Sequence, residues 1–201
     1  MDDRNCCGIE YFGDVVAINK EVPDFEIDAY QNGKISKWKL KEQRGKWVVV
    51  MFYPADFTFV CPTELEEAAR LYKDFQKEGA ELVSISTDTA FAHKAWHDTS
   101  PAIAKVEYPM LADPTGKISR MFNVYIDDEG LALRGTFIID PKGILKTIEI
   151  HENSIGRNIE ETLRKVQAAK FVGTHKGEVC PVAWHPGDKT LKPSEKLINK
   201  I

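Results

Sequence analysis

The sequence predicts an α/β protein in which helices flank a mixed central sheet, followed by a C-terminal arm. Segments rich in strand-forming residues alternate with segments of helical periodicity through the middle of the chain, and turn-forming residues join pairs of strands on either side of that stretch. Beyond residue 173 the composition changes to prolines and glycines around a single large aromatic side chain. We therefore expect one folded domain over residues 1–172 and an arm over residues 173–201.

The first predicted elements are a hairpin and a buried strand. Residues 24–30 alternate between polar and apolar, meet an Asn-Gly dipeptide, and are followed by a second alternating segment at 35–40, which indicates an antiparallel hairpin. Residues 46–53 (KWVVVMFY) are a continuous run of strand formers that ends at Pro54. Such a run is typical of a central strand buried on both faces.

The next elements alternate between helix and strand. Residues 62–79 have apolar side chains at helical spacing and end in glycine. A strand at 81–87, a helix at 89–98, a short strand at 110–112 and a short helix at 115–122 follow. Because strand, helix and strand succeed one another, the sheet should contain parallel pairs.

The last predicted elements are a second hairpin and a long helix. Residues 134–140 and 144–150 flank the turn tripeptide Pro-Lys-Gly, which predicts an antiparallel pair. Residues 158–172 have the spacing of an amphipathic helix.

Composition limits the class of protein. The 201 residues, 43% hydrophobic and 29% charged, suit one globular domain. A net charge of -4 and a pI near 5.8 lack the basic surface that nucleic-acid phosphates require, so we expect no nucleic-acid partner. No apolar run has the length of a signal peptide or a membrane span, so we expect a cytoplasmic protein with no membrane association. Four cysteines in a reducing compartment are more often catalytic, metal-binding or inert than a disulfide framework.

Cys61 is the candidate nucleophile. It lies between the buried strand and the first long helix and is followed by Pro62, a residue suited to the first helical turn. An isolated cysteine is more often a small buried apolar residue. At a helix start, however, free backbone amides and the helix dipole favour the thiolate, which is the nucleophilic form.

The position three residues after Cys61 decides what this thiol can do. A thioredoxin-type Cys-x-x-Cys pair would have a second cysteine there, but Glu64 occupies the position. A disulfide between such neighbours is therefore excluded. The chemistry either stops at one oxidised thiol or uses a cysteine far along the chain.

Pro54, Thr58 and Cys61 form the pattern Pro-x-x-x-Thr-x-x-Cys, which resembles the signature of the peroxiredoxins. The segments FYPADFTFVCPTE, STDT, HKAWH, RGTFIIDP and GEVCP extend the resemblance from about Val22 to Ile201, within the typical two-cysteine class and most like the bacterial alkyl hydroperoxide reductases. The resemblance implies a thioredoxin-like fold and a thiol-dependent peroxidase that reduces hydrogen peroxide and organic hydroperoxides.

The resemblance also assigns roles to residues. It implies that Cys61 attacks the peroxide, Thr58 hydrogen-bonds it, and Pro54 shields the site from water. Arg134 would hold the thiolate and the reacting oxygens, and Glu64 would orient that arginine. Without the resemblance, Arg134 would be interpreted as a solvated charge at a strand end and Thr58 as a helix cap.

A second arginine, Arg157, matches one that joins this network in many relatives. Cys180, in the predicted arm, would capture the oxidised Cys61 as a disulfide between two subunits of a head-to-tail dimer. Five such dimers would form a decamer. The resemblance implies no cofactor, and the electron donor stays open between thioredoxin and a flavoprotein disulfide reductase.

Two further groups were considered for metal or redox roles. Cys6 and Cys7 precede the matching region and are expected to be exposed and incidental. His93 and His97 are one helical turn apart, but Lys94 stands where metal-binding His-Glu helices have their glutamate. We expect both histidines on the helix surface and no metal site.

Two alternatives differ in class from a peroxidase. A general thiol-disulfide oxidoreductase is disfavoured by the missing neighbouring cysteine. A chaperone or scaffold built on a large ring would not need Cys61 at all. Peroxide consumption by a Cys61→Ser variant separates these possibilities.

Overall fold

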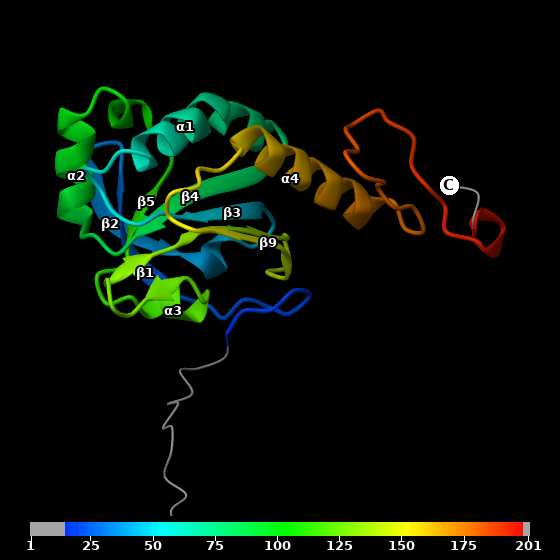
Figure 1. The fold of residues 1–201 in the computed structure, drawn as a ribbon, viewed down its shortest axis with the longest axis horizontal. Helices are drawn as coiled ribbons and strands as arrows, with labels where there is room; N and C mark the ends of the chain where they lie inside the picture. Colours follow the sequence, from blue (N-terminus) through cyan, green and yellow to red (C-terminus); the bar gives the residue numbers. More distant parts are fainter. Residues whose placement is uncertain (1–14, 199–201) are drawn as a thin grey trace, which may run out of the picture.

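The computed structural model describes residues 15–198 and confirms the α/β class (Figure 1). The residues expected to form hairpins, the central strand and the long helices do so. The strands are β1 (Glu26–Gln31), β2 (Lys34–Lys39), β3 (Trp47–Phe52), β4 (Ala80–Ser86), β5 (Met110–Ala112), β6 (Tyr125–Ile126), β7 (Leu131–Ala132), β8 (Arg134–Ile139) and β9 (Leu145–His151). The helices are α1 (Cys61–Lys77), α2 (Ala90–Thr99), α3 (Lys117–Met121) and α4 (Ile159–Thr174).

Seven of these strands form one mixed sheet in the order β2-β1-β5-β4-β3-β8-β9. The pairs β3/β4 and β4/β5 are parallel, as the alternation of elements predicted, and the other neighbouring pairs are antiparallel, including the two predicted hairpins. All six residues of β3 are buried, which suits a strand with neighbours on both sides and side chains covered on both faces. β6 and β7 form a small separate hairpin that the sequence did not indicate.

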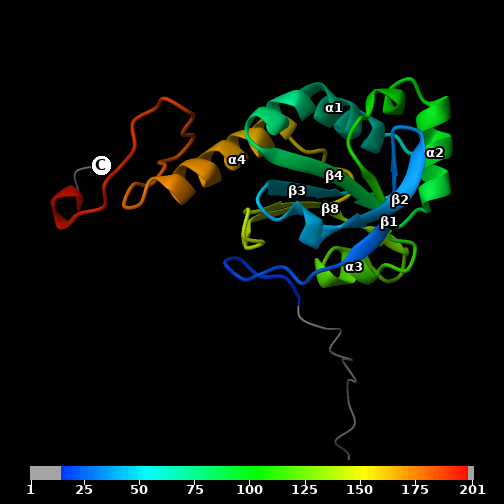
Figure 2. The same cartoon turned by 180° about the vertical axis from the view of Figure 1, so that it is seen from behind.

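Helices cover both faces of the sheet, as the two opposite views show (Figures 1 and 2). On one face Val49 and Met51 pack in a cluster with α1 and α4. On the other face Val48 and Val50 pack with α3 and with the chain that precedes β1. This split follows from the strand period of two, which sends successive side chains of β3 to opposite faces.

Local signals explain where the elements start and stop. Thr89 caps α2 by accepting from the Ala92 amide at 3.2 Å, and Asn158 caps α4 by accepting from the Glu161 amide at 3.0 Å. After α1 the chain turns at Gly79, whose φ of +75° lies in the left-handed region that glycine adopts without strain.

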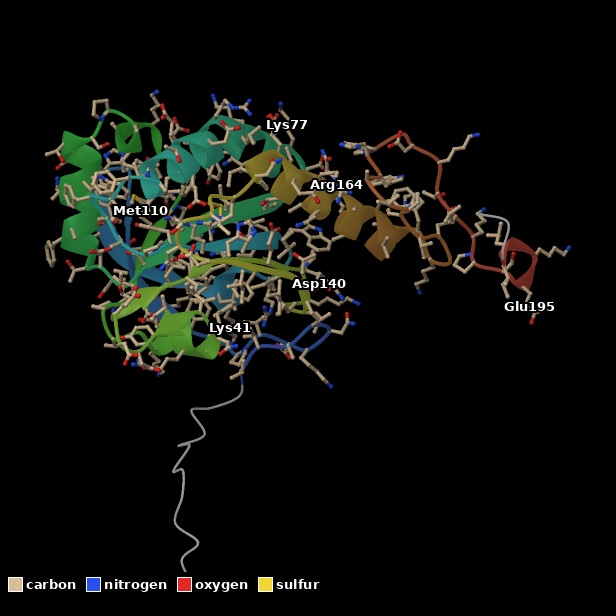
Figure 3. All side chains as sticks on the ribbon, viewed as in Figure 1. Lys41, Lys77, Met110, Asp140, Arg164 and Glu195 are labelled. Atoms are coloured by element: carbon tan, nitrogen blue, oxygen red, sulfur yellow. The ribbon has the colours of Figure 1, made fainter. Side chains whose placement is uncertain are left out.

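The C-terminal segment leaves the domain beyond the end of α4, as expected for an arm (Figures 1 and 2). Its Trp184 is buried, with its ring 4.9 Å from that of Phe171 on α4. Arg164, labelled on α4 in Figure 3, donates to the Trp184 carbonyl at 2.9 Å. Trp184 and the hydrogen bond from Arg164 therefore help to dock the arm on α4.

Candidate active site

Cys61 is the first residue of α1, at the end of the loop that leaves β3. Pro62 follows in the first turn, as predicted. The amides of Thr63 and Glu64 donate to the Val60 carbonyl at 3.1 and 3.3 Å, so these two are not free to face an anion. The helix dipole remains, but a second source of positive charge must hold the sulfur as an anion.

Arg134 supplies that charge. It is the first residue of β8, which pairs with β3 and so reaches the same end of the sheet as the loop. Its Nη1 donates to the Cys61 Sγ at 3.3 Å and to Glu64 at 2.8 Å. Its Nε donates to the Asn153 carbonyl at 2.9 Å, which fixes the plane of the guanidinium. The predicted contact between Arg134 and the sulfur is present.

Glu64 lies one helical turn after Cys61 and joins both arginines. Arg157 donates to it from Nη2 at 2.9 Å, from Nε at 3.1 Å and from the backbone amide at 2.8 Å. Burial raises the pKa of the Glu64 carboxyl, but the hydrogen bonds and charge of Arg157, together with the charge of Arg134, bring the pKa below its usual value. Glu64 is therefore a carboxylate that orients both guanidinium groups.

The net charge of this cluster depends on the sulfur. Glu64, Arg134 and Arg157 have side chains that are 1–4% exposed, and Cys61 is fully buried. Two guanidinium groups and one carboxylate leave one positive charge unbalanced when Cys61 is a thiol. Buried charges are costly unless they are paired. The cluster therefore offers a negatively charged group at Sγ a positively charged partner in Arg134.

Thr58 and Pro54 lie in the same loop. The Thr58 hydroxyl donates to the Ala55 carbonyl at 2.9 Å. Its oxygen lone pairs therefore remain available to accept a hydrogen bond from a substrate. Thr58 is half-buried and Pro54 is buried. Thr58 is not the cap of α1, since the capping residue is Val60.

Burial of Cys61 limits access to the sulfur. Its exposed fraction is 0%, so no water-sized probe reaches it in this conformation. Phe57 and Phe59, which flank Thr58 in the loop, are exposed. A hydroperoxide can therefore reach Sγ only when side chains of this loop move.

Cys180 lies apart from Cys61. Its Sγ faces the Ala168 carbonyl of α4 at 3.9 Å, so this part of the arm packs against α4, and the arm as a whole lies away from the start of α1 (Figures 1 and 2). Both cysteines are free. Burial raises the pKa of the Cys180 thiol, with the charge of Arg164 opposing it, so this sulfur is protonated at neutral pH.

The prediction that both histidines lie on the surface of α2 is wrong for His93. Its side chain is fully buried and hydrogen-bonded to Asp56, while His97 is half-buried beside Tyr30. Among residues 15–198 there is no cluster of histidine, cysteine, aspartate and glutamate that could hold a metal ion. Cys6 and Cys7 lie outside the described residues.

Sequence reasoning missed two participants in the site. One is the Asn153 carbonyl that holds Arg134, and a backbone group leaves no signal in the sequence. The other is Asp56, whose side chain is buried inside the loop that leads to Cys61.

Within residues 15–198, no helix is both long and apolar enough to cross a bilayer.

A buried cysteine that an arginine contacts at the start of a helix has the surroundings of a reactive thiol. Residues 18–148 match the model of the AhpC/TSA family, and residues 168–201 match the model described as the C-terminal domain of 1-Cys peroxiredoxin. The chain belongs to the AhpC/TSA family and is a peroxiredoxin.

Individual relatives agree with this assignment. The chain is 51% identical over 184 residues to alkyl hydroperoxide reductase C of Pseudomonas aeruginosa strain UCBPP-PA14, covering 92% of this chain and 98% of that protein. It is 48% identical over the same shares to the protein of that name from Escherichia coli K12.

Solved structures show the same fold. The crystal structure of Enterococcus faecalis AhpC matches with a TM-score of 0.80 and 44% identity, over 83% of this chain and all of that one. Reduced Plasmodium vivax 2-Cys peroxiredoxin matches with a TM-score of 0.84 and 34% identity, over 89% of this chain and 94% of that one. The expected thioredoxin-like α/β fold is therefore confirmed.

Proposed function

We propose that Cys61 is the sulfur that reduces the hydroperoxide. The thiolate attacks the outer oxygen of the O–O bond, the bond breaks, and the departing oxygen takes a proton to leave as water or an alcohol. Cys61 becomes a sulfenic acid. The observation that carries this proposal is the 3.3 Å contact between Arg134 Nη1 and Sγ inside a buried cluster whose charges balance only when the sulfur is ionised.

The other site residues then have distinct tasks. Arg134 stabilises the thiolate and the negative charge that develops on the departing oxygen, while Glu64 and Arg157 keep its guanidinium in place. The Thr58 hydroxyl accepts a hydrogen bond from the peroxide, and Pro54 excludes water behind it. These roles follow the geometry around Sγ and the resemblance noted in the sequence.

Cys180 is proposed to resolve the sulfenic acid. Its thiol condenses with the Cys61 sulfenic acid to form a disulfide and release water. The location of the arm, against α4 and away from the start of α1, favours a partner in a second chain (Figure 1). Residues up to 172 then form the peroxidase domain and residues 173–201 the arm. We expect head-to-tail dimers, five of which form a decamer.

The proposed setting follows the relatives. Proteins named alkyl hydroperoxide reductase C match nearly the whole chain, so we propose organic hydroperoxides and hydrogen peroxide as substrates. We expect a cytoplasmic location, where thiols are kept reduced. Thioredoxin or a flavoprotein disulfide reductase would return the disulfide to two thiols.

Two substitutions test the roles of the cysteines. Wild-type protein treated with one equivalent of peroxide should run as a covalent dimer on non-reducing electrophoresis, and Cys180→Ser should not, although it still consumes one equivalent. Cys61→Ser should consume no peroxide. A covalent dimer in Cys180→Ser that contains a Cys61–Cys61 bond, or unchanged peroxide consumption by Cys61→Ser, would contradict the assignment.

A further inference from the structure

A buried polar network lies behind the loop that carries Cys61. Asp56, in this loop, is joined to His93 on α2 by a 2.8 Å contact between Oδ2 and Nδ1, and both side chains are 0% exposed. The Tyr53 hydroxyl donates to Asp56 Oδ1 at 2.7 Å. His93 Nε2 contacts the Leu111 carbonyl of β5 at 2.9 Å. None of these groups touches the sulfur.

The partners fix where the hydrogens lie. A backbone carbonyl can only accept, so His93 Nε2 carries a hydrogen towards Leu111. The contact between His93 Nδ1 and Asp56 Oδ2 also needs one hydrogen, which lies on the imidazole or on the carboxyl group. The ring therefore bridges β5 and the loop with both of its nitrogens in use, and rotation of His93 would leave buried polar atoms without partners.

The same loop is held at two further points next to Asp56. The Asp56 amide donates to Asp88 Oδ2 at 2.8 Å, just beyond β4. The following residue, Phe57, has a φ of +55° and sets its ring 5.9 Å from that of Trp96 on α2. A bulky residue stays in that strained conformation only when its surroundings over-determine it.

These contacts act on the part of the loop that leads into the active site. After Phe57 come Thr58, whose hydroxyl turns back to the Ala55 carbonyl, and then the residues that end at Cys61. The segment from Asp56 to Cys61 is therefore short, and contacts with α2, β4 and β5 together hold its first residue.

We propose that Asp56 and His93 are positioning residues that hold the loop, and with it Thr58 and Cys61, in the arrangement that reacts with peroxide. The inference rests on the proposed function of Cys61. Loss of the bridge leaves the chemistry of the sulfur intact but lets the loop sample conformations in which Sγ is no longer buried beside Arg134. Peroxide reduction then slows, while alkylation of the exposed sulfur becomes faster at about pH 9, where a thiol ionises without help from Arg134.

α2 provides a matched control for His93. His97, one turn later, contacts the Tyr30 hydroxyl through Nδ1 at 3.2 Å and, like His93, contacts a backbone carbonyl through Nε2, that of Val106 at 3.3 Å. It makes no contact with the loop that carries Cys61. Glutamine can keep a donor at the position of Nε2 in either histidine and removes the partner at Nδ1.

His93→Gln and His97→Gln are therefore compared by two rates at Cys61. Stopped-flow mixing with peroxide should show a loss of about tenfold in His93→Gln. Alkylation by iodoacetamide, followed on the Cys61 peptide by mass spectrometry, should become several-fold faster by the same reasoning. His97→Gln should stay within about twofold of wild type in both rates, because it leaves the loop untouched. Urea unfolding gives the free energy of unfolding of each variant. From this value we calculate the alkylation rate that global unfolding alone would allow.

Opposite changes of the two rates, beyond what global unfolding allows, support the proposal. Equal behaviour of the two variants, or faster alkylation fully explained by global unfolding, overturns it. If His93→Gln does not fold, Tyr53→Phe is the test, because it keeps the aromatic ring but removes the donor to Asp56 Oδ1. We expect the peroxide rate to fall and the alkylation rate to rise by about threefold each. The absence of these two changes overturns the proposal. Wild-type protein that consumes no peroxide would instead contradict the proposed function itself.

Discussion

Arg134→Ala is expected to slow the reaction of Cys61 with hydroperoxide by about 100-fold or more. The arginine donates to the sulfur at 3.3 Å and to Glu64 at 2.8 Å. In the proposed mechanism it would stabilise both the thiolate and the charge that develops on the departing oxygen. Arg134→Lys keeps the charge but loses the planar fork that reaches the sulfur, Glu64 and Asn153 together. It should recover only part of the rate.

Thiolate population alone cannot account for a loss of this size. Lowering the pKa of a thiol from about 8.5 to about 6 raises the thiolate fraction at pH 7 roughly 30-fold. The same change weakens the nucleophile by about tenfold, with a Brønsted slope of about 0.4–0.5, so the net gain is only a few-fold. Most of the acceleration must come from donors aimed at the developing charge.

Stopped-flow rates and thiolate absorbance, measured together, separate these contributions. For Arg134→Ala, the rate should fall far more than the thiolate fraction does. Thr58→Val should also slow the reaction, with Thr58→Ser as the control that keeps the hydroxyl. Rates that fall no further than the thiolate fraction would show that the arginine only ionises the sulfur.

Glu64→Ala is expected to destabilise the fold by about 3–5 kcal/mol, because it leaves two buried guanidinium groups without their shared partner. Glu64→Gln keeps the shape and one acceptor and should cost less. The control is Glu67→Gln on the same helix, which removes an exposed ion pair with Arg70 and should cost less than about 1 kcal/mol. Urea unfolding measures all three.

The pH dependence of unfolding identifies Glu64 independently. The pKa of this carboxyl is below its ordinary value of 4.5 in the folded protein, so the unfolded chain binds the proton more readily. The stability that Glu64 contributes is therefore complete above about pH 4.5 and is lost as the pH falls through the lower, folded pKa. Glu64→Gln should reduce this acid sensitivity, and an unchanged profile would contradict the role of the carboxylate.

Much of the fold could be predicted because its signals are local. The Asn-Gly turn, the continuous apolar run at 46–53 and the helix ending at Gly79 each depend on residues next to one another. β6 and β7 were missed because strands of two residues are too short to show a period. His93 was misplaced although it precedes the buried Trp96 by three residues, so the helical period puts both on one face.

The site was only partly predictable for the same reason. Cys61 and Glu64 are one helical turn apart, and the sequence places them on the same face of α1. Arg134 and Arg157 come from distant segments, and only the resemblance pointed to them. No pattern in the chain shows that the sulfur is buried or that Arg134 is held by a backbone carbonyl, because both depend on how β8 and the segment after β9 pack around α1.

Burial of the sulfur shapes the whole catalytic cycle. In the described conformation Cys61 is closed off both from bulky molecules and from Cys180 on the arm. In the proposed cycle, peroxide needs a movement that uncovers Sγ, whereas a disulfide with Cys180 needs the two sulfurs to meet. We expect the start of α1 to move for that second step.

The most direct measurement is the mass of the Cys61 peptide in Cys180→Ser protein after one equivalent of hydroperoxide, with the sulfenic acid trapped by a dimedone-type reagent. The account predicts that the trapped adduct forms on Cys61, and that Arg134→Ala protein forms far less of it in the same time. An unmodified Cys61 thiol after peroxide has been consumed would contradict the claim that this sulfur performs the reaction.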